Sequence, residues 1–286
     1  MRVISGHTRV AALIGSPARH SLSPVILNAA FEELGLDWRF VVFEVPAGEG
    51  AAAVAAMRTL GLGGMSVTMP HKDAAFAAVD GRTPVAEALG AVNCVFRDGA
   101  RLVGDNTDGD GFLASLAVDH GIEVAGLRCV LVGAGGAGRA VARALGAAGA
   151  ADVAVVNRSP APAQRAAELA GLAGRVGVPD DVAKADLVVN ATPLGMGGRA
   201  HDDPVTLPVD AAALHDGQVV VDLVYHPTTT PLLAAAAERG AVVVTGVGML
   251  VHQAAHALRR WTGAEPPVVA MTAAATAELG RRSAGN

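Results

Sequence analysis

Lysine is rare in this chain, and one of its two copies lies in a turn that could carry acid–base chemistry. Lys and Arg number 22 together, yet only Lys72 and Lys184 are lysines, and Lys72 ends the segment Gly64-Met-Ser-Val-Thr-Met-Pro-His-Lys72. An arginine stays protonated at any working pH, whereas a partly desolvated lysine can lose its proton and act as an acid or a base. Lys72 is either an acid–base group of this kind or an ordinary surface lysine, and the residues around it favour the acid–base role.

Two other segments are dense in polar side chains. His20-Ser21-Leu-Ser23-Pro24 places two hydroxyls on alternate residues before an expected helix, and Gly104-Asp-Asn106-Thr107-Asp108-Gly-Asp-Gly111 places an acid at the start of another. Ser23 and Asp108 could each be a helix cap, which accounts for either one taken singly. Capping does not explain why a lysine-bearing Thr-x-Pro-x-Lys turn accompanies them.

A glycine-rich segment predicts a dinucleotide site. Gly133-Ala-Gly135-Gly-Ala-Gly138 fits G-x-G-x-x-G, follows an apolar strand and opens an Ala-rich helix, which is the context that this motif requires. Gly133 allows the tight turn, Gly135 lets the backbone approach a pyrophosphate, and Gly138 lets helix and strand pack closely. The helix N-terminus then offers free N–H groups to the anion.

The end of the next strand favours NADP over NAD. An NAD site usually has an acid there, to bind the ribose 2′-hydroxyl, but this chain reads Val155-Val-Asn157-Arg158-Ser159. A carboxylate would repel a 2′-phosphate, whereas a guanidinium can pair with it through two hydrogen bonds. The alternative for Arg158 is a solvated turn residue.

Composition indicates a cytoplasmic protein with a sizeable hydrophobic core. The 286 residues are 51% hydrophobic and carry a net charge of −5, without a basic stripe; we expect no nucleic-acid partner. No signal peptide or membrane-spanning run is evident. Cys94 and Cys129 are too few for a disulfide framework or a zinc knuckle, and we expect two reduced, half-buried thiols.

The first hundred residues predict a mixed α/β domain. Strands are expected at Val10–Ile14, Arg39–Val45 and Gly64–Val67, with a hairpin of Val92–Phe96 and Arg101–Val103 across Asp98-Gly99. Helices are expected at Pro24–Leu34, with Ser23 as the N-cap, and at Ala47–Leu60.

A second unit begins near Arg128 and alternates strands with helices, which predicts a parallel sheet with right-handed crossovers. Its strands are Cys129–Val132, Val153–Val156, Leu187–Val189, Val219–Asp222 and Val242–Thr245, and its helices are Gly136–Ala148 and Pro162–Ala170. Gly197–Pro204 is polar and Gly-rich, so we expect a mobile loop there. After Thr245 the strands stop, and helices are expected at Gly248–Trp261 and Met271–Arg281.

Taken together, the chain resembles the shikimate dehydrogenase family. The matching segments, in order, are Gly15-Ser-Pro17, His20–Pro24, Ser66–Lys72, Gly90–Asn93, Asn106–Asp108, Gly133–Gly138, Asn157-Arg158, Asn190–Met196, Asp222–Pro227 and Gly248–Gln253. The resemblance implies an N-terminal mixed α/β substrate domain, residues 1–109 with 246–286, and a Rossmann-type NADP-binding domain, residues 110–245. It also implies that the last helices return to the first domain.

The resemblance implies a role for each matched position. Lys72 and Asp108 correspond to the catalytic dyad. Ser21 and Ser23 correspond to the residues that bind the substrate carboxylate, with Tyr225 nearby. Thr68, Asn93 and Gln253 correspond to the residues that bind the ring hydroxyls. The NADP positions are Gly133, Ala134, Gly135, Gly136, Ala137, Gly138, Thr192, the 2′-phosphate clamp Asn157 and Arg158, and the nicotinamide neighbours Gly246 and Met249. The implied reaction is the reversible, NADP-dependent reduction of 3-dehydroshikimate to shikimate by a monomer or homodimer.

Three residues differ from the family pattern and widen the range of substrates that the resemblance allows. The family usually has Asn where Ser66 stands, Thr where Cys94 stands, and commonly His at the position of Leu27. A quinate or aminoquinate-type dehydrogenase of the same family is therefore an alternative, and a non-catalytic nucleotide-binding regulator is another. A regulator would have no use for the proton-transfer pair of Lys72 and Asp108.

Metal catalysis is the remaining rival. His252-Gln-Ala-Ala-His256 places two histidines on one helix face, but Gln253 stands where a metalloprotease has its glutamate, and no third ligand is apparent. We expect no metal, and we expect His20 and His71 to be loop or packing residues.

Overall fold

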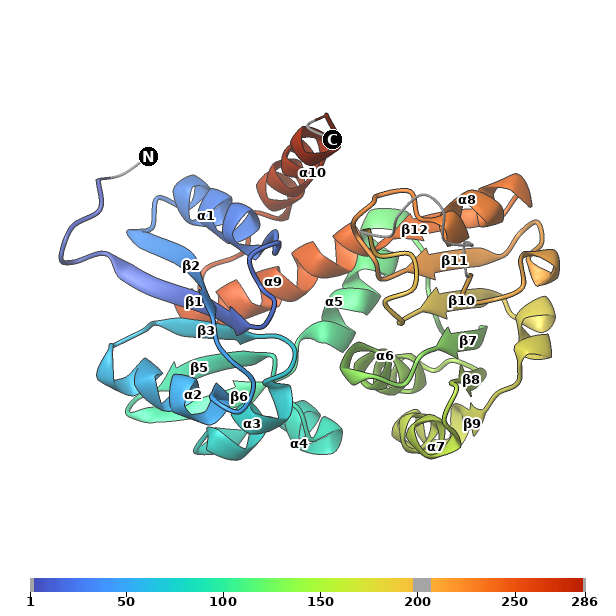
Figure 1. Cartoon of the computed structure of the whole chain (residues 1–286), viewed down its shortest axis with the longest axis horizontal. Helices are drawn as coiled ribbons and strands as arrows, with labels where there is room; N and C mark the ends of the chain where they lie inside the picture. Colours follow the sequence, from blue (N-terminus) through green and yellow to red (C-terminus); the bar gives the residue numbers. More distant parts are fainter. Residues whose placement is uncertain (1–2, 198–206, 285–286) are drawn as a thin grey trace. The chain divides into compact units, whose positions relative to one another are not determined.

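The computed structural model describes residues 3–197 and 207–284, and the chain divides into two compact units. The first unit runs to Gly111 and resumes at Leu250, and the second unit runs from Phe112 to Met249 (Figure 1). Residues 198–204 of the expected loop lie outside the described residues.

A mixed sheet organises the first unit. Its described strands are β1 (Arg9–Gly15), β2 (Trp38–Glu44), β3 (Gly64–Val67), β4 (Gly81–Arg82), β5 (Cys94–Asp98) and β6 (Arg101–Asp105), in the order β2-β1-β3-β5-β6-β4. β1 is parallel to β2 and β3, whereas β5 is antiparallel to β3 and forms the expected hairpin with β6. The sequence therefore predicted the strands of this sheet correctly, apart from the two-residue β4.

The helices of the first unit differ from the sequence pattern at their ends. They are α1 (Ser23–Glu33), α2 (Gly50–Thr59), α3 (Lys72–Ala78), α4 (Pro84–Leu89) and the start of α5 (Asp108–Ala114). Ser23 is not the N-cap, because the helix begins at Ser23 itself and Leu22 precedes it as the cap residue. The short α3 and α4 were not predicted, since six or seven residues hold too few turns to show a periodic pattern.

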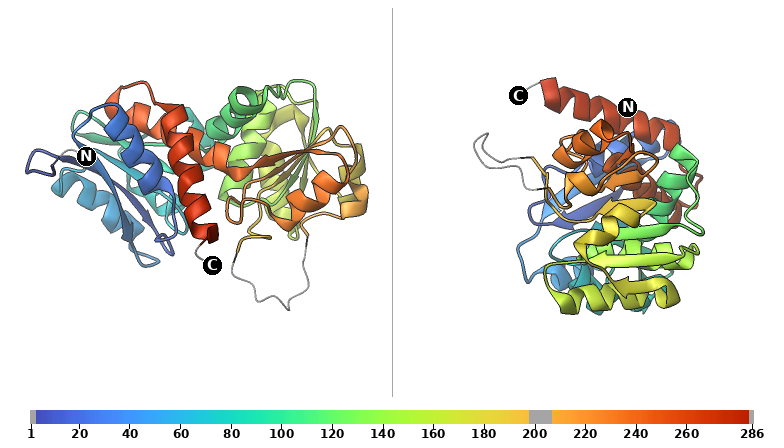
Figure 2. Two further views of the ribbon diagram at one scale, coloured as in Figure 1. Left: turned by 90° about the horizontal axis from the view of Figure 1, so that it is seen from above. Right: turned by 90° about the vertical axis from the view of Figure 1, so that its right-hand side faces the viewer.

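The C-terminal helices pack within the first unit. They are α9 (Gly246–Thr262), which enters the unit at Leu250, and α10 (Val268–Ala284), and α10 lies along α1 (Figure 2). The Trp261 indole donates a hydrogen bond to the Val95 carbonyl at 3.1 Å and stacks on Phe40. Gly64 makes this fit possible, because a Cβ there would overlap the Trp261 ring. The expected return of the last helices to the first domain is thus confirmed.

The second unit is a Rossmann fold. Its described strands are β7 (Arg128–Val132), β8 (Asp152–Val156), β9 (Gly174–Val176), β10 (Leu187–Asn190), β11 (Val219–Asp222) and β12 (Val242–Thr245), and its α-helices include α6 (Gly136–Ala147), α7 (Pro160–Leu169) and α8 (Pro231–Glu238). All neighbouring strands are parallel, in the order β12-β11-β10-β7-β8-β9. This order is the doubly wound 3-2-1-4-5-6 arrangement. In such a sheet, ligands bind at the carboxyl ends of the two central strands, here β7 and β10, where the chain connections lead off in opposite directions.

Both cysteines are more deeply buried than the sequence indicated. Cys94 is 0% exposed and Cys129 is 1% exposed, because each lies on a central strand beneath packed helices. Burial raises the pKa of the Cys129 thiol to about 12 and raises the pKa of the Cys94 thiol as well. Both therefore remain protonated and act as small apolar groups.

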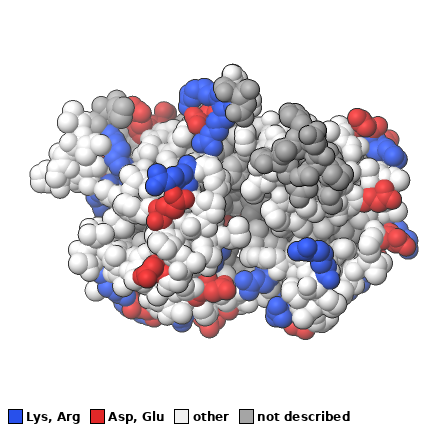
Figure 3. All heavy atoms as spheres, in the orientation of Figure 1, with Lys and Arg blue, Asp and Glu red and all other residues white. Residues whose placement is uncertain are grey.

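Charged side chains are mixed on the surface. On the face drawn in Figure 3, basic and acidic groups alternate over both units and do not gather into one basic surface. Across residues 3–197 and 207–284, no helix combines the length and the apolar character needed to cross a membrane.

Candidate active site

Lys72 is held in an ion pair in the first unit. It is the first residue of α3, and the Lys72 carbonyl accepts a hydrogen bond from the Val92 N–H at 3.1 Å. Its ammonium donates to Asp108 Oδ2 at 2.6 Å, and the two side chains are only 18% and 10% exposed. An ordinary surface lysine would be solvated, so the geometry favours the acid–base interpretation.

Asp108 is the acceptor of two side-chain donors. Its second oxygen, Oδ1, accepts from Asn93 Nδ2 at 2.7 Å, while its backbone N–H donates to Asn106 Oδ1 at 3.2 Å. Asn106 thus satisfies the Asp108 N–H at the start of α5, and the Asp108 carboxylate accepts hydrogen bonds from Lys72 and Asn93. Helix capping by the Asp108 side chain, the alternative weighed from the sequence, does not describe this geometry.

Thr107 fixes the orientation of Asn93, a connection that the sequence did not reveal. Asn93 Oδ1 accepts from the Thr107 N–H at 2.8 Å, and Asn93 Nδ2 also lies 3.2 Å from Thr107 Oγ1. Because the backbone N–H can only donate, the Asn93 oxygen must face Thr107 and its amide nitrogen must face Asp108. Lys72, Asn93 and Asp108 therefore form one buried, oriented network.

The other expected substrate residues of this unit make local contacts. Ser21 Oγ donates to Ser23 Oγ and accepts the Ser23 N–H, both at 3.1 Å. Gln253, on α9, donates to the Leu250 carbonyl at 2.8 Å. Thr68 follows β3 and packs so closely on Gly15 that a Cβ at Gly15 would overlap its methyl group. Among the described residues, none of these four side chains forms a hydrogen bond with Lys72 or Asp108.

The glycine loop of the second unit has the geometry of an anion site. Gly133 has a φ of +103°, and a Cβ at Gly138 would overlap the Gly133 carbonyl oxygen, so both positions require glycine. Gly135 is the cap residue of α6, is exposed, and would place an added Cβ in open space. The loop therefore leaves the N-terminus of α6 accessible to a negatively charged group.

The end of β8 is tied to this loop. Asn157 Oδ1 accepts from the Ala134 N–H at 3.3 Å, and Asn157 Nδ2 donates to the Ser159 carbonyl at 3.0 Å. The neighbouring Arg158 side chain is exposed and forms no hydrogen bond or ion pair with another described residue. The structure thus presents a guanidinium where a 2′-phosphate would need one.

A fully buried polar network lies at the ends of β10 and β11, and the sequence did not reveal it. Asn190 Nδ2 donates to Asp222 Oδ1 at 2.8 Å, and Thr230 Oγ1 donates to Asp222 Oδ2 at 2.6 Å; burial raises the pKa of Asp222 above its ordinary value. Thr192, an expected cofactor residue, donates its N–H and its hydroxyl to Asn190 Oδ1. Asn190 therefore fixes Thr192 beside Gly133, whose Cβ would lie 2.9 Å from the Thr192 methyl group.

Three further expected site residues lie in the second unit: Gly246, Met249 and Tyr225. Gly246 approaches this strand so closely that a Cβ would overlap the Leu223 carbonyl oxygen. Met249 packs against the hydrophobic core, and Tyr225 is half-buried in the segment after β11.

The histidines show no metal-binding arrangement. His252 is buried and His256 is half-buried, and burial lowers the pKa of His256. His71 is a packing residue, 1% exposed, with Nε2 at 2.9 Å from the Val45 carbonyl oxygen. Within the described ranges 3–197 and 207–284, no three His, Cys, Asp or Glu side chains cluster as a metal site.

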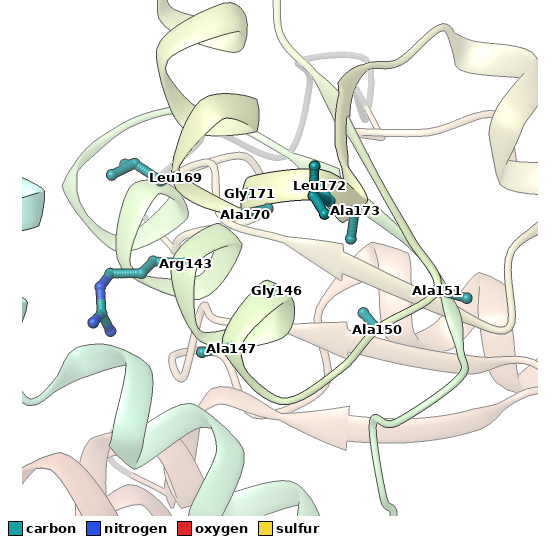
Figure 4. Close-up of a pocket in the computed structure, with 10 residues that line it drawn as sticks. All are labelled: Arg143, Gly146, Ala147, Ala150, Ala151, Leu169, Ala170, Gly171, Leu172 and Ala173. Atoms are coloured by element: carbon teal, nitrogen blue, oxygen red, sulfur yellow. The ribbon is translucent and has the colours of Figure 1, made fainter.

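A pocket of about 580 Å³ in the second unit lies away from this chemistry. It sits at the C-terminal end of α6, whereas the glycine loop precedes the N-terminal end of that helix (Figure 4). Small apolar residues dominate its lining, which consists of Arg143, Gly146, Ala147, Ala150, Ala151, Leu169, Ala170, Gly171, Leu172 and Ala173. The Lys72–Asp108 pair and the glycine loop are not part of this lining, so we do not assign the active site to this pocket.

Family models match three parts of the chain. Residues 13–95 match the shikimate dehydrogenase substrate binding domain, residues 115–193 match shikimate / quinate 5-dehydrogenase, and residues 246–276 match the shikimate 5′-dehydrogenase C-terminal domain. These matches cover most of both units.

Relatives agree over almost the full length. A shikimate dehydrogenase (NADP(+)) from Geobacter metallireducens is 46% identical, over 92% of this chain and 94% of its own. The crystal structure of shikimate 5-dehydrogenase from Thermus thermophilus with NADP(H) and shikimate has a TM-score of 0.86 at 39% identity, covering 94% of this chain and 99% of its own. A quinate dehydrogenase from Corynebacterium glutamicum, solved with NAD, has a TM-score of 0.83 at 32% identity, covering 94% and 99%.

Proposed function

This chain belongs to the shikimate dehydrogenase family, and on that premise we propose that it catalyses the reversible, NADP-dependent reduction of 3-dehydroshikimate to shikimate. The observation that carries the proposal is the buried ion pair between Lys72 and Asp108, with 2.6 Å between Nζ and Oδ2. A regulator without catalysis would gain nothing from a desolvated lysine that is aligned by an oriented carboxylate. The enzyme would act in the cytoplasm as a monomer or homodimer.

The first unit supplies the groups that would bind the substrate. Ser21 and Ser23 offer two hydroxyls 3.1 Å apart at the start of α1, which suits a carboxylate acceptor. The family resemblance assigns Tyr225 to the same carboxylate. Thr68, Asn93 and Gln253 would hold the ring hydroxyls. Asn93 has its amide nitrogen already directed toward Asp108, so a hydroxyl bound there would lie beside the proton-transfer pair.

The second unit fits NADP. The N-terminus of α6 would receive the pyrophosphate, because Gly135 leaves open space there and Gly133 and Gly138 allow the tight turn. Asn157 and Arg158 would hold the 2′-phosphate, and Thr192, Gly246 and Met249 would line the nicotinamide end. When bound, NADP supplies or accepts the hydride.

Proton transfer falls to the residues of the first unit. Reduction of the ketone leaves an alkoxide oxygen, and the Lys72 ammonium would donate its proton to that oxygen; in the reverse direction the neutral amine would remove it. Asp108 holds Nζ at 2.6 Å and so restricts the lysine to one position. Asn93 prevents the carboxylate from rotating away, because it binds the second oxygen at 2.7 Å.

Two glycines of the nucleotide loop should respond differently to an added methyl group. We expect Gly135→Ala to keep the melting temperature of the wild type but to weaken NADP binding by roughly tenfold, because its Cβ enters the open space that the pyrophosphate would approach. Gly138→Ala should instead lower stability by about 1–3 kcal/mol, because its Cβ overlaps the Gly133 carbonyl. Thermal melting and NADP titration separate the two effects; equal effects of both variants on both measurements would contradict this account of the loop.

Shikimate should be oxidised with a higher kcat/KM than quinate. Quinate has an additional hydroxyl on the carbon that bears the carboxylate, and Ser21 and Ser23 would already be committed to that carboxylate. A buried hydroxyl without a partner costs about 1–3 kcal/mol, which corresponds to roughly 5- to 150-fold in kcat/KM.

Steady-state assays with both acids, each with NADP and NAD, test the substrate and the cofactor together. Comparable kcat/KM values for shikimate and quinate with NADP would move the chain to the quinate alternative. Turnover of neither acid by the folded protein would favour the regulator.

A further inference from the structure

Asp105 is a buried carboxylate that the proposed mechanism does not use. It ends β6, lies three residues before Asp108, and is only 4% exposed. A charged group in such surroundings is unfavourable unless several donors compensate for the lost water.

Three donors from three parts of the first unit converge on this carboxylate. The Thr83 hydroxyl, before α4, and the Asn106 N–H donate to Oδ1 at 2.6 and 2.8 Å. Arg260, on α9, donates from Nε to Oδ2 at 2.9 Å, and its guanidinium also lies over the Phe96 ring. Asp105 therefore links the chain after β6 to α9 and to the start of α4.

Both residues that orient Asp108 are themselves bonded to Asp105. The Asp105 carbonyl accepts the Asn93 N–H at 3.0 Å, and Asn93 in turn holds the Asp108 carboxylate. Asn106, 1% exposed, receives the Asp108 N–H on Oδ1 and donates from Nδ2 to the Ala91 carbonyl at 3.2 Å. One hydrogen-bonded path thus runs from the Asp105 backbone carbonyl through Asn93 to the Asp108 carboxylate. A second path runs from the Asp105 carboxylate through Asn106 to the Asp108 backbone N–H.

We propose that Asp105 is a positioning residue for the Lys72–Asp108 pair, and that Arg260 supports it from α9. The same helix touches the segment a second time, because Gly111 lies against Gln253 and a Cβ there would be 2.6 Å from the Gln253 backbone nitrogen. α9 therefore contacts both ends of the stretch from Asp105 to Gly111. The proposal rests on the proposed function, since it assigns a role within that mechanism.

Chemical labelling of the lysines tests the geometry without any substrate. Acetic anhydride reacts with accessible amines, and the ion pair with Asp108 at 2.6 Å holds the Lys72 side chain in place at only 18% exposure. Because Lys184 is the only other lysine and is exposed in the second unit, its labelling is an internal standard. We expect Asp105→Asn to raise the Lys72-to-Lys184 labelling ratio several-fold, as Asp108→Asn should, measured by peptide mass spectrometry.

Kinetics give the second readout. Asp105→Asn should lower kcat for shikimate about tenfold while the Kd for NADP stays within about twofold of wild type. The matched control is Asp80→Asn. Like Asp105, Asp80 accepts hydrogen bonds from an arginine side chain (Arg58) and from a backbone N–H (Leu102). Its side chain is 37% exposed, however, and among the described residues it makes no hydrogen bond to Asp108 or to the residues that orient Asp108. Its kcat and labelling ratio should equal those of the wild type.

Arg260→Lys, which keeps the cation, should retain more activity than Arg260→Gln.

The outcomes separate this proposal from the proposed function. A wild-type protein that oxidises no acid would refute the proposed function, while the labelling ratio would still decide whether Asp105 holds the pair together. An unchanged labelling ratio in folded Asp105→Asn would overturn the positioning role. A loss of kcat that matches the loss of folded protein, or an equal loss in Asp80→Asn, would overturn it as well.

Discussion

Lys72→Ala is expected to lower kcat for shikimate oxidation by on the order of 10²–10⁴-fold, with a much smaller change in KM. The physical reason is that the proton moves only in the transition state, so the loss of the amine affects turnover more than binding. The ion pair with Asp108 at 2.6 Å places this amine in a largely buried network. Steady-state kinetics with saturating NADP, on protein of wild-type melting temperature, measures the effect.

Lys72→Arg is the matched variant for this prediction. It keeps the positive charge beside Asp108 and can keep an ion pair, but a guanidinium does not release its proton at working pH. It should therefore be nearly as inactive as Lys72→Ala. A variant of either kind that keeps wild-type kcat, or that loses activity only through a raised KM, would show that Lys72 binds substrate and does not transfer the proton.

Arg158→Ala is expected to raise KM for NADPH roughly tenfold to a hundredfold while leaving KM for NADH nearly unchanged. The loss of a hydrogen-bonded charged partner costs about 1.5–3 kcal/mol, and only NADPH has the 2′-phosphate that Arg158 would pair with. The exposed guanidinium has no partner among the described residues, so its removal should not disturb the fold.

Arg165→Ala provides the control for charge alone. Arg165 is exposed on α7 in the same unit, so its removal changes the net charge equally without touching the end of β8. Its KM values for both cofactors should match those of the wild type. Equal losses for NADPH and NADH in Arg158→Ala would instead make Arg158 a structural residue.

The second unit could be predicted from the sequence because its signals are local. Five of the strands are short apolar runs, the connections after β7 and β8 have helical patterns, and the glycine loop requires backbone geometry that only glycine tolerates at Gly133. β9 and α8 were missed, since three residues and an Ala-rich stretch show little periodic contrast. The alternation of strands and helices predicted that the strands are parallel, but it did not predict their order in the sheet.

The connections within the candidate site could not be predicted in the same way. The sequence placed Lys72, Asn93 and Asp108 in separate segments, and only folding shows that Asn93 points its amide nitrogen at Asp108. The expectation that Ser23 caps α1 failed because the sequence alone could not show that the helix already includes Ser23. No role could be assigned to Asp105 within its polar segment from the sequence, because its partner Arg260 is 155 residues away along the chain.

Chemical rescue of Lys72→Ala tests the central claim most directly. If the Lys72 amine transfers the proton, then methylamine added to the folded variant with shikimate and NADP should restore NADPH formation in proportion to its concentration, with little effect on the wild type. The claim would be contradicted by a variant that binds shikimate and NADP with wild-type affinity, yet forms NADPH at a rate that does not change with methylamine.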